Sequence, residues 1–193
     1  MPVPIPSDPQ AHPVLGPLLR YWQGKRGARA LPARRDIDPL EMGPDLLPHL
    51  LLTDLLDRGT RVRFRLVGTT LVKRLGFDPT GRYLEGEMKG GWWDTVAALH
   101  RLAYAERAPF YGESELTWDG GRRIEARMLL LPLSQDGPDP AIALGAVVFA
   151  STEVFLPTLR ALAGTATHGE VLREVLQPAP APGRARAAGR EVA

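Results

Sequence analysis

RVRFRLVGTTLVKRLGFDPTGRY, residues 61–83, is the stretch that decides the fold of this chain of 193 residues. Its opening alternates arginines with apolar residues, which predicts a strand with charges on one face. Residues 69–75 follow as a short apolar helix, with a threonine as its N-terminal cap and Gly76 at its end. Asp-Pro-Thr-Gly at 78–81 is a strong turn sequence. The stretch therefore predicts a strand, a helix and a turn in that order.

A Leu-rich strand precedes this stretch, across a loop at residues 57–60. The pairs expected on one face are Leu55 with Val62, Thr53 with Phe64, and Leu51 with Leu66. On the other face Asp54 lies opposite Arg63, with Arg61 and Arg65 beside Leu56 and Leu52. A slip of one residue would mix the two faces, so this register is the favoured one. We expect the arginines to protect an edge strand, and an anion site is the alternative.

Three further elements follow along the chain. A helix is predicted at 92–107, because Trp93, Val96, Ala97, His100 and Tyr104 repeat at helical spacing. Residues 110–118 and 122–133 predict a hairpin with a three-residue loop. Its expected pairs are Leu116 with Ile124, Ser114 with Ala126, Gly112 with Met128, Phe110 with Leu130, Glu113 with Arg127, and Thr117 with Arg123. Residues 141–150 are apolar without alternation, which is typical of a central strand covered on both faces.

This order of elements resembles the core of a PAS sensory domain. The stretch at 61–83 is similar to the RFRYRLVGT…LG-D-TGR segment of a bacterial single-domain PAS group, and the resemblance covers roughly residues 21–150. It implies an α+β fold with a five-stranded antiparallel sheet. Helices would cover one face, the last strand would lie centrally, and the second and third strands would be edges. Residues 141–150 are apolar without alternation, which supports the central place of the last strand independently of the resemblance.

The chain divides into five expected segments. Residues 1–13 are Pro-rich and expected to be flexible, and 14–48 form an N-terminal helical flank with a helix at 14–23. Residues 49–150 form the PAS-like core. Residues 151–177 are predicted to be a C-terminal helical segment, and 178–193 a disordered basic tail of low complexity.

Composition excludes several kinds of chemistry. The absence of cysteine excludes disulfides, thiolate nucleophiles, Cys-ligated metals and the cysteinyl photochemistry of flavin-binding PAS domains. No apolar run is long enough to span a bilayer, and the first residues lack a signal-peptide pattern. A cytoplasmic location is therefore expected. The basic ends are expected to be solvated flanks rather than a nucleic-acid or lipid contact, since no recognition pattern accompanies them.

A ligand pocket is expected between the sheet and the long helix. Its candidate lining residues are Phe64, Leu66, Trp93, Val96, His100, Tyr104 and Met128. Haem-binding PAS domains use a histidine in the comparable helix, so His100 is a possible ligand by resemblance and a packing residue otherwise. We expect no haem or other cofactor, because a single histidine is weak evidence for one. No metal site is expected either, since the four histidines are not at ligand spacing.

The opposite face of the sheet also needs cover. Leu52 and Leu56 point to it, and the N-terminal helix, the C-terminal segment or a second subunit could bury it. Flanking helices of PAS-like proteins commonly mediate dimerisation, so the resemblance implies a homodimer. The candidate interaction residues are Leu15, Leu18, Trp22, Leu52 and Leu56. Asp36 is expected to cap a turn or to pair with an arginine.

The sequence favours a sensory or regulatory protein without an output domain of its own. It would act by binding an unknown small molecule or a signalling partner. One alternative is an interaction or dimerisation module with a filled core. The other is a small cone-shaped hydratase or isomerase, which needs a pair of polar residues that converge in its cavity. Only His100 and Tyr104 are expected inside the cavity of this chain, so no catalytic residue and no enzyme activity are expected.

Overall fold

The computed structural model describes residues 9–85, 88, 91–118, 122–135, 137–150 and 158–161. The helices are α1 (Leu15–Arg26), α2 (Thr69–Leu75) and α3 (Gly91–Glu106), with short 3-10 turns at Arg34–Asp36, Pro39–Met42, Leu47–His49 and Asp57–Gly59. The strands are β1 (Leu50–Leu56), β2 (Arg61–Val67), β3 (Phe110–Trp118), β4 (Arg122–Ser134), β5 (Pro140–Ala150) and β6 (Thr158–Ala161). In this part of the chain, no helix combines the length and the apolar character needed to cross a membrane.

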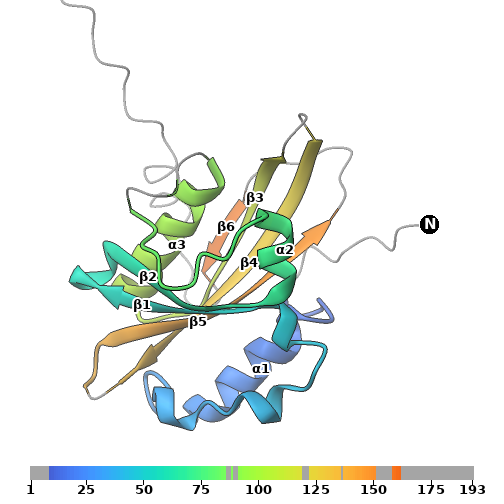
Figure 1. Ribbon diagram of the computed structural model, residues 1–193. Coiled ribbons are helices and arrows are strands. Elements are labelled where there is room, and N and C mark those ends of the chain that lie inside the picture. Colours follow the sequence, from blue (N-terminus) through green and yellow to red (C-terminus); the bar gives the residue numbers. More distant parts are fainter. Residues whose placement is uncertain are drawn as a thin grey trace, which may run out of the picture.

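One antiparallel sheet divides the molecule into two layers of packing (Figure 1). The strand order is β2-β1-β5-β4-β3-β6, with α2 and α3 on one face and α1 on the other. We call the α3 side the inner face and the α1 side the outer face. The α+β antiparallel fold and the central place of β5 are thus confirmed.

A sixth strand corrects the prediction of five strands with a C-terminal helix. Thr158–Ala161, expected to be helical, pairs with Phe110 to Glu113 of β3. An unpaired strand edge offers a row of backbone donors and acceptors, and this pairing outweighs the local preference for helix. The edge strands are therefore β2 and β6, and β3 is not an edge. The rest of 151–177 lies outside the described residues.

A bulge alters the predicted register of β1 and β2. The pairs of Thr53 to Leu56 with β2 are as predicted, but Leu51 lies opposite Val67 and not Leu66. The register shifts between Leu52 and Thr53, so that β2 has one extra residue there. Leu66 consequently turns to the outer face beside Leu52. The sequence cannot reveal this, because both Leu66 and Val67 are apolar and either one could face inward.

The free edge of β2 is closed by backbone pairing. The Phe64 amide donates to the Arg82 carbonyl at 3.0 Å, and the Leu84 amide donates to the Val62 carbonyl at 2.9 Å. The Val62 amide in turn donates to the Glu85 carboxylate at 2.9 Å. The turn at 78–81 thus returns the chain alongside β2, which provides the edge protection that the sequence analysis assigned to the arginine side chains.

The other local predictions largely hold. Every predicted pair of the β3–β4 hairpin is present, although its loop at 119–121 lies outside the described residues. Helix α2 has the predicted bounds and ends at Gly76 with φ of 77°. Thr69 and Thr70 do not cap it, because Gly68 occupies the N-cap position and no side chain caps the helix.

Helix α1 covers the outer face within the same chain. Leu15 and Leu18 are fully buried and Trp22 is 1% exposed, against β4 and β5 residues such as Leu131 and Leu144. The Trp22 indole N–H donates to the Pro132 carbonyl at 2.9 Å. These three α1 residues are therefore not available to a partner, contrary to their prediction as an interaction face.

Candidate functional site

Most of the predicted pocket residues meet in the inner core. Phe64, Val96 and Met128 are at most 2% exposed and belong to one apolar cluster, with Trp93 and Tyr104 partly buried against it. The rings of Phe64 and Trp93 pack edge to face at 6.3 Å. Leu66 does not belong here, because the bulge places it on the outer face, where it is 50% exposed.

His100 lies at the centre of the inner core and is fully buried. Its Nδ1 lies 2.7 Å from the Val96 carbonyl oxygen, which can only accept, so Nδ1 carries the proton. Nε2, 3.0 Å from Thr53 Oγ1, then accepts the threonine hydroxyl hydrogen. Burial lowers the pKa of His100 to about 4, so the ring is neutral at physiological pH. Both ring nitrogens are thus occupied by the protein itself.

A close contact seals the inner core at the β1–β2 loop. Gly59 has φ of 79°, and a Cβ built on it would lie 2.6 Å from the Tyr104 Cβ. Only glycine fits both the left-handed backbone and this distance. The loop therefore packs directly on α3 at Tyr104.

Trp92 carries a buried polar atom that no described residue pairs with. It is 4% exposed, and its indole nitrogen has no hydrogen-bond partner among the described residues. A buried donor without an acceptor is uncommon in proteins.

The outer face carries an apolar groove of about 320 Å³. Its floor includes Leu66, Leu52 and Leu144, which lie opposite one another across β2, β1 and β5. The remaining lining residues are Arg34, Ile37, Pro39, Met42, Leu47, Leu50 and Leu51. Sequence reasoning named Leu52 as an interaction residue, but it missed the wall between 34 and 47. Apolar residues within an irregular flank were the only sequence signal for that wall.

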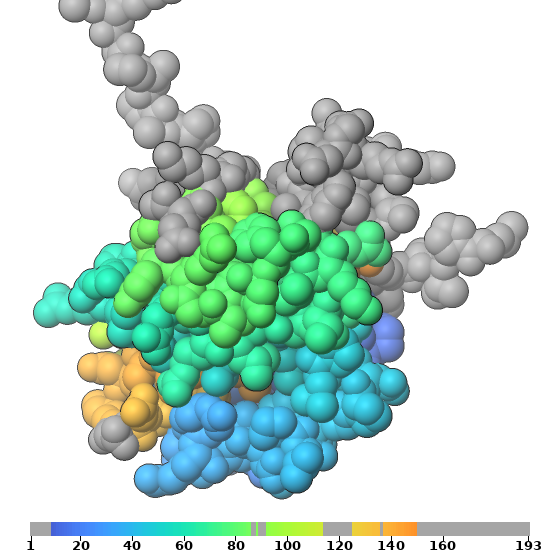
Figure 2. All heavy atoms as spheres, in the orientation of Figure 1, coloured from blue at the N-terminus to red at the C-terminus, as the bar shows by residue number. Residues whose placement is uncertain are grey.

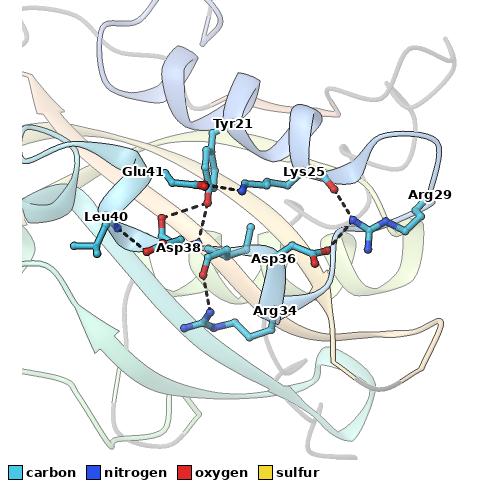
Figure 3. A network of polar contacts seen from close by, with 9 residues as sticks. Tyr21, Lys25, Arg29, Arg34, Asp36, Asp38, Leu40 and Glu41 are labelled. Carbon is cyan, nitrogen blue, oxygen red and sulfur yellow. Dashed lines mark hydrogen bonds and ion pairs between the residues drawn. The ribbon is translucent and has the colours of Figure 1, made fainter.

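The groove wall is held to α1 by polar contacts (Figure 3). The Tyr21 hydroxyl accepts the Asp38 amide hydrogen at 2.9 Å, and Lys25 Nζ lies 2.6 Å from Glu41 Oε2. In Figure 2 the flank, coloured blue to cyan, lies beneath the green segment that contains α2. Because α1 is itself buried against the sheet, these contacts preform the groove.

Asp36 anchors the start of that wall, as expected. Its carboxylate accepts the Ala33 amide hydrogen at 3.0 Å and lies 2.7 Å from Arg29 Nη2. The Ala33 amide, and then Arg29, hold the pKa of Asp36 below its usual value. The prediction that Asp36 caps a turn or pairs with an arginine is confirmed on both counts.

Positive charge lies at two places around the groove. Arg34 Nη1 donates to the Ile37 carbonyl at 3.1 Å, and Arg34 makes no ion pair within the described residues. On the same face of the sheet, Asp54 lies 2.9 Å from Arg63 and 3.1 Å from Arg65. Two arginines on one carboxylate leave one positive charge in excess.

A second polar cluster lies on the outer face of β3 and β4. The Arg127 guanidinium donates to Glu125 and lies 3.5 Å from Glu113 Oε1. Tyr111 donates its hydroxyl hydrogen to Glu113, and burial raises the pKa of Tyr111. Glu125 and Arg127 are nearly buried, as charges inside proteins are when they are paired. The sequence predicted only the Glu113–Arg127 part of this cluster.

Three comparisons with known proteins bear on the family of this chain. No curated protein sequence matches the chain. A solved structure described as the PAS domain from Bordetella pertussis BvgS is similar over 72% of this chain and 95% of that chain, at 14% identity and with a TM-score of 0.38. A family model described as PAS domain matches residues 10–148, which include α1 and the groove wall. Since that match covers well over half of its sequence, the chain belongs to the PAS domain family.

Proposed function

We propose that this protein has a sensory or regulatory role, and that it acts by binding at the outer groove. The groove carries the proposal: it is concave, almost wholly apolar, and bounded by a wall fixed to α1. Its volume lies within the range of small-ligand sites. Membership in the PAS family supports the regulatory role.

The inner core is the less favourable place for a ligand. Phe64, Val96 and Met128 pack there with almost no exposure. A haem iron would need a free ring nitrogen on His100, and both nitrogens are hydrogen-bonded inside the protein. We therefore propose a structural role for His100, without haem. A fully buried, neutral imidazole is also poorly placed to act as a general base, which supports a protein that is not an enzyme.

One observation favours a second candidate function, an inner site beside α3. The indole N–H of Trp92 is buried without an acceptor among the described residues, and a ligand oxygen there would satisfy it. Substituting Trp92→Phe removes this donor and keeps most of the apolar volume. A ligand whose affinity falls in this variant binds inside, and one whose affinity is unchanged does not.

A homodimer or a signalling partner remains part of the proposal, through surfaces other than the buried side of α1. Leu47 and Leu66 are 38% and 50% exposed at the groove, so a second copy is the main rival occupant. The mass of the wild type and of Leu66→Glu in solution separates the two occupants. A dimer that this substitution dissociates would place a second copy in the groove.

The groove proposal is tested by screening metabolites by thermal shift against wild type, Leu66→Glu and Leu40→Glu. Leu66 lines the groove, whereas Leu40 is 88% exposed and does not line it. We expect compounds that stabilise the wild type and Leu40→Glu and fail to stabilise Leu66→Glu. Compounds that stabilise all three proteins equally would contradict binding at the groove.

A further inference from the structure

We propose that the outer groove binds an amphiphilic anion, namely a single alkyl chain that ends in a carboxylate. This inference rests on the proposed function, since it names the ligand class of the same groove. It combines two observations, a row of leucines that crosses three strands and an arginine, Arg34, that is the one charged side chain among the described lining residues.

The apolar part of the groove suits a linear chain. Leu66, Leu52 and Leu144 form a continuous row across three strands, and Ile37 and Met42 face this row from the wall. An alkyl chain bound on such a surface would be removed from contact with water along its length. Each methylene buried in this way strengthens binding about fourfold.

The charge pattern selects an anionic head group. Arg34 lines the groove, and within the described residues its guanidinium makes a single hydrogen bond, to the Ile37 carbonyl, so the rest of the guanidinium fork can pair with a carboxylate. The excess charge of Arg63 and Arg65 over Asp54 adds to the attraction, since Asp54 and Leu52 lie two residues apart on the same face of β1. No acidic side chain is among the described lining residues to repel an anion.

The size of the groove favours a free small molecule over a macromolecule. A volume of about 320 Å³ is at the lower end of the range for small-ligand sites, which a medium-length chain suits. The contacts of Tyr21 and Lys25 with the wall hold it in place beside this volume. The proposed ligand is therefore the free alkyl carboxylate in solution.

The test is isothermal titration calorimetry on the full chain with octanoate, decanoate and decanol, below the concentrations at which micelles form. We expect decanoate to bind roughly fifteenfold more tightly than octanoate, because two more methylenes are buried. Decanol should bind at least tenfold more weakly than decanoate, since it cannot form the charge-assisted pair.

Two matched pairs of variants locate the site. Arg34→Gln should weaken decanoate binding at least tenfold and leave decanol unchanged. Arg35→Gln, which removes the adjacent exposed arginine that does not line the groove, should behave as the wild type. Leu66→Glu should abolish the binding of both decanoate and decanol, and Leu40→Glu should not. Circular dichroism establishes that each variant is folded.

Each contrary outcome is informative. If decanoate and decanol bind equally and Arg34→Gln changes neither, the anionic head group is wrong while binding at the groove stands. If neither decanoate nor decanol binds to the folded wild type, the inference fails. The proposed function then survives only if other compounds still distinguish Leu66→Glu from the wild type. If no compound distinguishes them, both proposals fail.

Discussion

His100 Nε2 lies 3.0 Å from Thr53 Oγ1 and so joins α3 to β1 inside the inner core. The second ring nitrogen of His100 binds the Val96 carbonyl one turn earlier on the same helix. This arrangement occupies both ring nitrogens of His100 and keeps the imidazole neutral at physiological pH. It also makes the fold sensitive to acid.

The first prediction concerns the pH dependence of stability. Burial lowers the pKa of His100 to about 4, from a usual value of 6.5, so the unfolded chain binds this proton more readily than the fold. Its contribution is full above pH 6.5 and is lost as the pH falls towards 4, by about 3 kcal/mol in all. Urea unfolding of wild type and His100→Gln between pH 7 and 4.5 measures this. Equal losses of stability in both proteins would show that His100 is not the group responsible.

The second prediction concerns Gly59, which contacts Tyr104 of α3. Gly59→Ala places a Cβ 2.6 Å from the Tyr104 Cβ and also strains a backbone with φ of 79°. Gly76→Ala is the matched control, because its φ is 77° and nothing lies within 4 Å of its added Cβ. We expect Gly76→Ala to cost about 1 kcal/mol and Gly59→Ala clearly more, in urea unfolding. If the two costs are the same, the contact with Tyr104 contributes nothing.

The third prediction tests how α1 covers the sheet. Trp22→Ala should destabilise the protein by about 3–5 kcal/mol, because it opens a cavity in the outer core. Trp22→Phe should cost less, about 1–2 kcal/mol, since it mainly removes the bond to the Pro132 carbonyl. Urea unfolding gives both values. If both changes leave the free energy of unfolding nearly unchanged and a dimer is lost, Trp22 instead lies in an intermolecular interface.

The fourth prediction concerns Asp54 and its two arginines. Asp54→Asn leaves Arg63 and Arg65 without their counterion on the outer face. Both arginines are more than 40% exposed, so the expected loss is small, about 1 kcal/mol. The loss should shrink further in high salt. Unfolding at low and high ionic strength checks this, and a loss of several kcal/mol at either would mean that the pair is more buried than described.

The sequence predicted the local pairing well where two faces agreed. In the β3–β4 hairpin, apolar and charged pairs both required the same three-residue loop, and every predicted pair is present. At the end of β2, Leu66 and Val67 are both apolar, so the sequence does not distinguish the two faces of the strand. The bulge at this place could therefore not be predicted. Strand β6 was missed because its pairing depends on the open edge of β3 and not on its own four residues.

The groove could not be predicted for a related reason. Its floor depends on the bulge that turns Leu66 outward, and its wall depends on contacts such as Tyr21 with Asp38, which lie 17 residues apart. Neither follows from periodicity. The predicted pocket residues of α3 do meet in the inner core, because their helical spacing places them on the side of the helix that packs against the sheet.

The most direct test of binding at the outer groove is to map decanoate binding on the full chain by amide chemical shifts. Binding there predicts changes at Arg34, Ile37, Leu52 and Leu66, with none at His100 or Met128 in the inner core. It also predicts that these changes disappear in Leu66→Glu and persist in Leu40→Glu. Changes centred on Val96, His100 and Met128, retained in Leu66→Glu, would contradict it and place the ligand between the sheet and α3.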